Sequence, residues 1–151
     1  MQINLIPDSS VSSAPVGFTA AMQAAADVFE QDFSGNYTVN IRYGWGTINN
    51  KPNQTLTLLD GTLSLGLEVG YTDNVSYATV KSWLTANATL PDQIAAVSSL
   101  PASNTAFPGD ANAFNVSSAE EKAFGKFTGS VSAIDGAIGF NTAYAMNPWP
   151  F

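Results

Sequence analysis

The sequence predicts an α/β (α+β) fold, in which one twisted mixed β-sheet carries helices packed mainly on one face. The chain opens with a strand, a helix and a strand over residues 2–6, 16–33 and 37–43, an order typical of a βαβ crossover. The hydrophobic period changes from two to three or four and back across these segments. Neither a linker nor a repeat interrupts the 151 residues, so we expect a single domain spanning 1–151.

These first three elements carry the clearest patterns. Residues 2–6 form a short apolar strand that Pro7 closes, because proline has no N–H to donate. Over residues 16–33 apolar side chains recur at helical steps, and Ser34-Gly35 ends the predicted helix. The next strand is half-buried, with apolar residues in alternation: Tyr37, Val39, Ile41 and Tyr43.

The middle of the chain carries a hairpin signal. Asp60-Gly61 separates two apolar segments, 55–59 and 62–69, and this dipeptide suits a tight β-turn. A glycine-broken apolar run at 134–140 predicts the last strand. Capping residues predict three further helices, and these residues are Asn74 or Ser76, Pro91, and Ser117 with Glu120.

The composition excludes several functions for the chain alone. The sequence contains no histidine and no cysteine, which are the usual general base and the usual zinc ligands. We therefore expect no catalytic residue and no metal site, and an inactive chain. The net charge is −7 and the five basic residues form no stripe, so we expect no nucleic-acid partner. No run of ~18 apolar residues predicts a membrane span.

The surface composition indicates a secreted, extracellular protein. Only 11% of the residues are charged, so serine, threonine, asparagine and glutamine must cover the surface. The absence of cysteine makes the chain disulfide-free. The residues after Met1 lack the charged and apolar regions of a signal peptide, so we expect the leader to be absent from this chain.

A series of short segments occurs in a recognisable order along nearly the whole chain. The segments are Ile3–Ser10, Gly17–Ala21, Ala24–Ala26, Thr38–Ile41, Tyr43-Gly44, Ser76-Tyr77, Leu100-Pro101 and Asp135–Phe140. Together they resemble the N-terminal part of a family of secreted bacterial zincin-like (HExxH-type) metalloproteases. The hairpin around Asp60-Gly61 departs from the family's pattern.

The resemblance implies that the zinc site lies outside this chain. In the family, an H-E-x-x-H helix follows the Asp-Gly-containing strand, its histidines bind zinc, and its glutamate is the general base. The chain reaches Phe151 in the loop before such a helix. It would therefore be the noncatalytic scaffold portion, with a missing C-terminal catalytic half as its expected partner and zinc as the full-length family's cofactor.

The last predicted strand is the candidate substrate contact. By the zincin analogy, an extended substrate adds to the sheet edge formed by Gly136, Ala137, Ile138, Gly139 and Phe140. An uncovered edge is also a template for self-association. An alternative function is therefore an extracellular structural subunit that assembles through exposed strand edges.

A third alternative, a carbohydrate-binding module, depends on exposed aromatic residues. Trp45 lies between two glycines and Trp149 between two prolines, and such flanks favour loops. These two side chains are the ones we expect to be available for stacking on a sugar.

The acidic residues have structural interpretations. Glu120 and Glu121 lie at a capping box, where the helix dipole favours acids, which accounts for them without a catalytic pair. Asp8 and Asp135 are interpreted as turn residues. Arg42, on the polar side of its strand, is expected to form a structural ion pair.

Calcium is left as an unsupported alternative cofactor. Asp27, Glu30 and Asp32 lie on or near the polar face of the first helix, and hard oxygen ligands need no histidine. The chain has no Asp-x-Asp-x-Asp loop there, so a solvated helix face accounts for these acids more simply.

Overall fold

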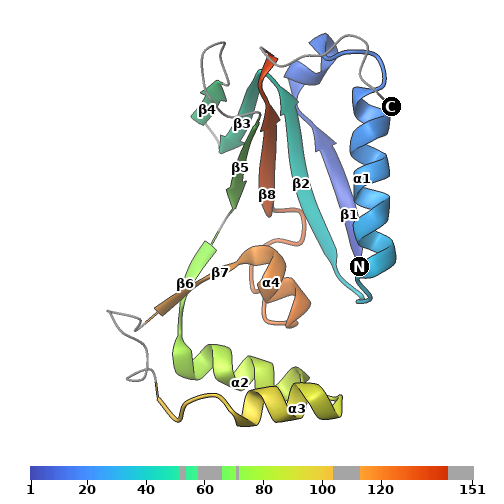
Figure 1. Cartoon of the computed structure of the whole chain (residues 1–151). Coiled ribbons are helices and arrows are strands. Elements are labelled where there is room, and N and C mark those ends of the chain that lie inside the picture. The colour runs from blue at the N-terminus through green and yellow to red at the C-terminus, as the bar shows by residue number, and fades with distance from the viewer. Residues whose placement is uncertain (52–53, 58–65, 71, 104–112, 143–151) are drawn as a thin grey trace. The chain divides into compact units, whose positions relative to one another are not determined.

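The computed structural model describes residues 1–51, 54–57, 66–70, 72–103 and 113–142 (Figure 1). The chain divides into two compact units, one of Met1–Tyr71 with Gly129–Phe151 and one of Thr72–Thr128. Each unit combines helices with strands, which confirms the predicted α+β class. The division does not decide whether 1–151 is one domain, so that prediction stays a prediction.

The first unit contains a four-stranded mixed sheet. The strand order is β1-β2-β8-β5; β1, β2 and β8 run parallel and β5 runs antiparallel to β8 (Figure 1). This is the mixed sheet that the sequence predicts. The bounds are β1 Gln2–Pro7, β2 Thr38–Trp45, β5 Gly66–Gly70 and β8 Gly136–Phe140.

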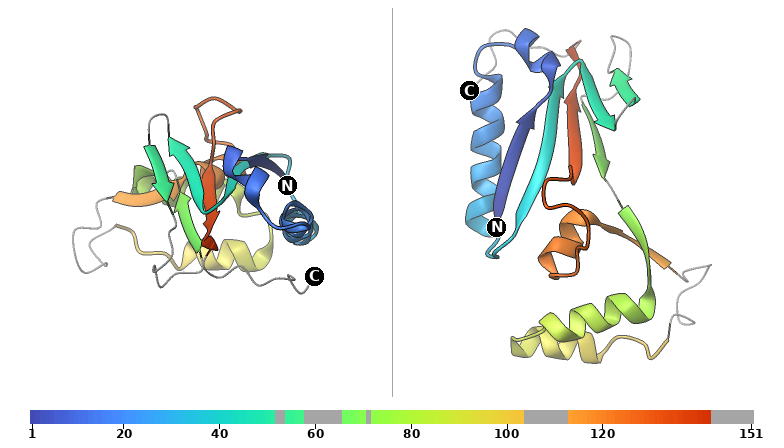
Figure 2. Two further views of the ribbon diagram at one scale, coloured as in Figure 1. Left: turned by 90° about the horizontal axis from the view of Figure 1, so that it is seen from above. Right: turned by 180° about the vertical axis from the view of Figure 1, so that it is seen from behind.

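The crossover from β1 to β2 contains a 3-10 turn, η1 (Ser9–Ser13), and the helix α1 (Phe18–Asp32). The helix predicted at 16–33 is therefore confirmed. It begins at Phe18 because Gly17, with φ of 94°, adopts a left-handed conformation that only glycine enters without strain. Figure 2 shows α1 alongside β1, which it contacts.

Aromatic side chains fill the space between α1 and the sheet. Phe18 and Met22 of α1 are buried with Tyr43 and Trp45 of β2. The ring centroid of Phe18 lies 5.1 Å from that of Trp45 and 5.3 Å from that of Phe140, both in edge-on arrangements. These contacts hold the helix on one face of the sheet.

The described strands between β2 and the second unit have two separate partners. β3 (Thr47–Lys51) pairs antiparallel with β4 (Gln54–Thr57), while β5 pairs with β8. The predicted hairpin of 55–59 with 62–69 falls mainly on residues 58–65, which lie outside the described residues, so it stays a prediction. The Asp60-Gly61 turn itself lies outside the described residues.

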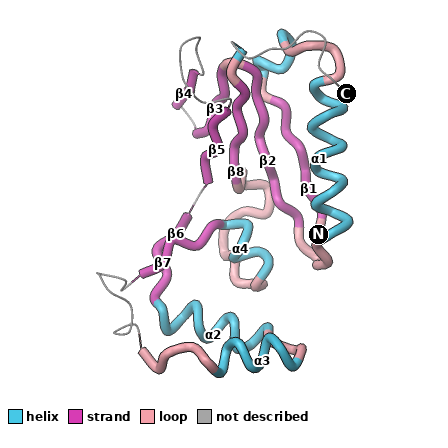
Figure 3. Tube along the Cα trace, viewed as in Figure 1, coloured by secondary structure: helices cyan, strands magenta, loops and turns pink. Residues whose placement is uncertain are grey.

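In its described residues, the second unit has its own two-stranded sheet and the helices α2, α3 and α4 (Figure 3). Ser76 caps the first of these helices by accepting from the backbone N–H of Thr79 (3.2 Å). Pro91 stands in the first turn of the second helix, and Ser117 and Glu120 form the predicted capping box on the third. The bounds are β6 Thr72–Ser76, α2 Tyr77–Asn87, α3 Pro91–Ser98, β7 Ala113–Ser117 and α4 Ser118–Ala123.

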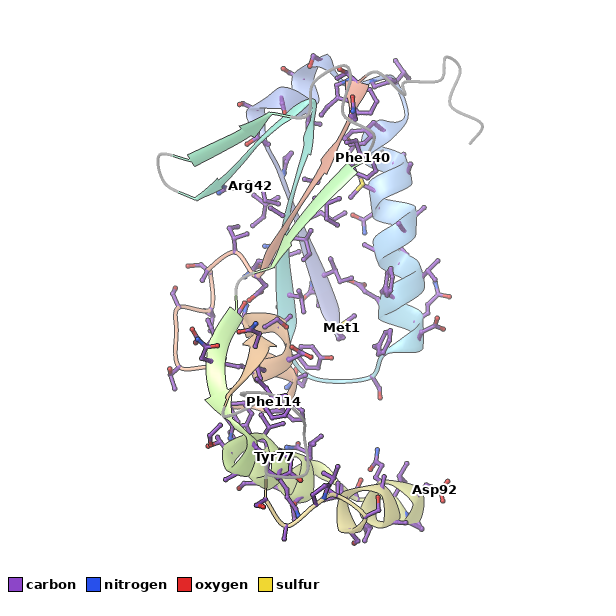
Figure 4. The ribbon with its side chains drawn as sticks, turned by 60° about the vertical axis from the view of Figure 1, so that its left-hand side comes forward. Met1, Arg42, Tyr77, Asp92, Phe114 and Phe140 are labelled. Carbon is purple, nitrogen blue, oxygen red and sulfur yellow. The ribbon has the colours of Figure 1, made fainter. Side chains whose placement is uncertain are left out.

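Aromatic and lysine contacts tie this unit together. Tyr77 is buried, its ring centroid lies 6.0 Å from that of Phe114, and its hydroxyl donates to the carbonyl of Pro101 (2.6 Å) (Figure 4). The Lys81 ammonium donates to the same carbonyl (2.7 Å), so the segment after α3 is held against α2. The ring centroids of Trp83 and Phe124 lie 5.9 Å apart.

Candidate functional site

The predicted substrate strand does not lie at the sheet edge. The residues Gly136, Ala137, Ile138, Gly139 and Phe140 form β8, which is bonded to β2 on one side and to β5 on the other. An extended peptide cannot add to a strand whose two sides are occupied. The edge prediction for these residues is therefore wrong, because β5 joins the sheet beside β8.

β5 takes the edge position next to β8. The backbone N–H of Gly46 donates to the carbonyl of Phe140 (2.8 Å). The backbone N–H and C=O groups of the even-numbered residues of β8 therefore point toward β2. The backbone groups of the odd-numbered residues of β8 then point toward β5, where these residues pair with Leu67 and Val69. The backbone N–H and C=O of Glu68 consequently point to the outer side of the sheet.

The opposite edge, β1, is poorly suited to pairing. The backbone N–H groups of Gln2 and Asp8 donate to the carbonyls of Tyr37 (3.0 Å) and Tyr43 (2.8 Å). The backbone N–H and C=O groups of the odd-numbered residues of β1 therefore point away from β2, to the outer side of the sheet. Of these, Ile3 already donates its N–H to the Glu30 carboxylate of α1, and Pro7 has no N–H. An acidic cap and a proline are two devices that block strand addition.

A buried polar network fixes the segment that leads into β8. Asn40 is 3% exposed and donates from its amide to the carbonyls of Val131 (2.8 Å) and Ala133 (2.9 Å). Asp135, also 3% exposed, accepts from the backbone N–H of Asn40 (2.8 Å). Asp135 therefore has a structural role, as predicted, but it follows the turn at 131–133 and bonds to β2 just before β8 starts.

The other predicted turn acid has a similar role. Asp8 is buried and accepts from the backbone N–H of Ser10 (3.0 Å), which caps η1. The hydroxyl of Ser10 accepts in turn from the backbone N–H of Trp45 (3.0 Å). This turn therefore connects the end of β1 to the end of β2.

The aromatic site is not present as predicted. Trp45 is 6% exposed and lies in the core against Phe18, so the prediction that it is an exposed contact is wrong. β2 extends through Gly44 without a loop, which keeps Trp45 on the same buried face as Tyr43. Trp149 lies outside the described residues.

The acids at α4 differ in environment. Glu120 completes the capping box by accepting from the backbone N–H of Ser117 (2.7 Å), as predicted. Glu121 is 8% exposed, and this burial raises the pKa of its carboxyl, with a further rise from the charge of Asp73. The capping pattern did not indicate that Glu121 is buried, since it says nothing about which face of so short a helix is covered.

The remaining charged candidates are spread out. On α1, Asp27 accepts from the Gln23 amide (2.8 Å) and Glu30 from Ile3, while Asp32 lies at the exposed last turn. Arg42 is half-buried on β2, and its predicted ion pair stays a prediction (Figure 4).

The residues present do not fit a zinc ion. The chain contains neither histidine nor cysteine, and among its described residues no three acids gather closely enough to hold a metal. No chemical step through zinc is therefore assigned to this chain. In the described part, no helix is both long and apolar enough to cross a bilayer.

The chain matches no protein-family model, no curated protein and no solved structure. The zincin-like family is therefore supported by the sequence resemblance alone.

Proposed function

We propose that this chain is the noncatalytic scaffold portion of a secreted zinc-metalloprotease-like protein, and that β5 is the edge that aligns a polypeptide substrate. The observation that carries the proposal is the four-stranded sheet, in which, among the described residues, the β1 edge is partly capped and the β5 edge has no second partner strand. β1 is capped by Glu30 and ends in Pro7, while β5 pairs only with β8 among the described strands. In this part of the chain, an extended peptide would add more readily at β5 than at β1.

The first unit also contains the element on which the resemblance depends most. The resemblance requires a crossover helix between the first two strands, and α1 spans Phe18–Asp32 there. A β-layer protein without that helix would have ended the proposal. In the whole protein, a zinc-activated water would hydrolyse the peptide bond, while this chain holds the substrate in extended form.

The metal chemistry is tested on the purified chain. We expect elemental analysis to find far less than one equivalent of zinc, and labelled casein to remain uncut, because no histidine or cysteine is present. One equivalent of bound zinc would overturn the proposal. A second check is the coding sequence after Phe151, where we expect a His-Glu-x-x-His helix within ~30 residues.

The alignment role is tested by proline substitution in the protein that includes such a helix. Glu68→Pro removes an outward N–H of β5 and leaves its bonds to β8 intact, so kcat/KM for casein should fall while the fold is retained. Leu67→Pro is the matched control, because it removes an N–H that faces β8 and should unfold the edge. Unchanged kcat/KM in a folded Glu68→Pro protein would refute the role of β5.

The two alternatives have weaker support. Filament growth through this sheet needs two free edges, and the β1 edge is capped by Glu30. Electron microscopy of the purified chain distinguishes the cases, since filaments would favour the structural subunit. The carbohydrate-binding alternative is weakened because Trp45 is buried in the core. Its other candidate residue, Trp149, lies outside the described residues.

A further inference from the structure

α1 and the residue before it carry two apolar stripes, of which one is buried. The buried stripe consists of Phe18, Met22 and Ala26. The second stripe consists of Gly17, Ala21, Ala24 and Val28. Its members follow one another at steps of four, three and four residues, the spacing that places side chains along one seam between paired helices.

The second stripe is open to solvent along most of its length. Ala24 is exposed and Val28 is 57% exposed. At Gly17 a Cβ would meet no atom within 4 Å, so there is free space at that end of the stripe. A soluble helix normally has one apolar stripe, and one that is apolar over most of its circumference is usually covered on more than one side.

We propose that this stripe is the contact between two copies of the chain, whose α1 helices pack antiparallel about a two-fold axis between Ala21 and Ala24. Gly17 and Val28 lie equally far from that axis, so the largest side chain of the stripe meets the smallest residue of the other copy. Val28 then enters the free space at Gly17. The alanines at the centre allow the helix axes to approach to about 8 Å, the close end of the usual range.

The distribution of charge along α1 favours the antiparallel direction. The helix has no basic residue, its acids Asp27, Glu30 and Asp32 all lie in its second half, and residues 9–26 carry no charge. In an antiparallel pair each acidic end lies beside the uncharged N-terminal end of the other helix, where the helix dipole is positive. The two Asp27 residues are then about 14 Å apart along the axis, which exceeds the Debye length of about 8 Å at physiological salt.

A membrane surface fits this helix less well than a second copy does. Helices that lie on membranes carry lysine or arginine on their polar face, whereas the charged residues of α1 are all acidic and repel anionic lipid. A second copy supplies an uncharged stripe of matching shape, because in a two-fold contact the same residues form both sides. The contact does not involve β5, so it is independent of the proposed substrate alignment.

Analytical ultracentrifugation of the full chain tests the contact. We expect a dimer at roughly 100 µM that dissociates on dilution below roughly 1 µM, because one helix pair buries less surface than a standard interface. Ala24→Glu places a carboxylate at the centre of the stripe and should weaken association about tenfold or more. Thr19→Glu is the matched control, since it adds the same charge at an exposed position on the opposite, polar side of α1 and should leave association unchanged.

A monomer at every concentration would overturn the proposal and leave the stripe to a different protein. So would a dimer that withstands Ala24→Glu, or one that Thr19→Glu weakens equally.

Disulfide formation tests the direction of the helices, since the chain has no native cysteine. Ala21→Cys should cross-link two copies, because its thiols lie near the two-fold axis. Val28→Cys should not, because its two positions are about 16 Å apart along the axis and a disulfide joins Cα atoms no more than about 7 Å apart. Cross-linking of Val28→Cys would indicate parallel helices and would contradict the proposed contact.

Discussion

Replacing Asn40 by alanine tests whether the polar network holds β8 in place. The substitution removes two bonds to the carbonyls of Val131 and Ala133 and one bond accepted from the Asn4 amide (2.8, 2.9 and 2.9 Å). Each such hydrogen bond contributes about 1 kcal/mol net to the free energy of unfolding. Because Val131 is 83% exposed, water can take the place of the lost amide donor at its carbonyl. We expect the free energy of unfolding of the first unit to fall by about 2–3 kcal/mol.

The measurement combines urea unfolding with amide hydrogen exchange. Exchange at the β8 amides should accelerate in Asn40→Ala, because the segment before β8 loses its anchor, while exchange in α2 should not change. Asn4→Ala is the matched control: it removes one bond at an exposed strand residue and should cost about 0.5 kcal/mol or less. If both variants lost the same stability, Asn40 would not be the residue that fixes β8.

Three further predictions concern the core, a cap and pH. Phe18→Ala should cost about 3–5 kcal/mol in urea unfolding, since Phe18 is 3% exposed, whereas the exposed control Val131→Ala should stay within about 0.5 kcal/mol. Ser117→Ala should destabilise α4 by about 1 kcal/mol, read from exchange in the second unit; no change would mean that the capping box is redundant. The raised pKa of Glu121 means that its contribution to stability is complete below its unfolded pKa and is lost as pH rises through the folded value. Glu121→Gln should therefore stabilise the second unit at pH 7 but not at pH 4, and the exposed neighbour variant Glu120→Gln should show no such gain.

Local patterns were sufficient for the helices and the first strands. The periodicity at 16–33 and the capping residues Ser76 and Ser117 act within a few neighbours, so they predict α1, α2 and α4 without knowledge of the tertiary fold.

Long-range pairing was not readable in the same way. β5 pairs with β8, roughly seventy residues later in the chain, and no local pattern indicates such a partner. Because of this pairing, β8 lies inside the sheet and not at its edge, and the candidate edge strand is β5. The glycines beside Trp45 suggested a loop, although its spacing from Tyr43 already placed both side chains on one face of a strand.

The position of β8 has a consequence for the order of assembly. β2 and β5 are both made long before β8, yet neither can complete its pairing in this sheet until β8 is inserted between them. During synthesis, the backbone groups on the β8 side of β2 therefore stay unpaired until β8 is made, and the nascent chain can mispair there. A polypeptide of residues 1–128 should show fast amide exchange throughout β5, and slow exchange there would mean that β5 has found another partner.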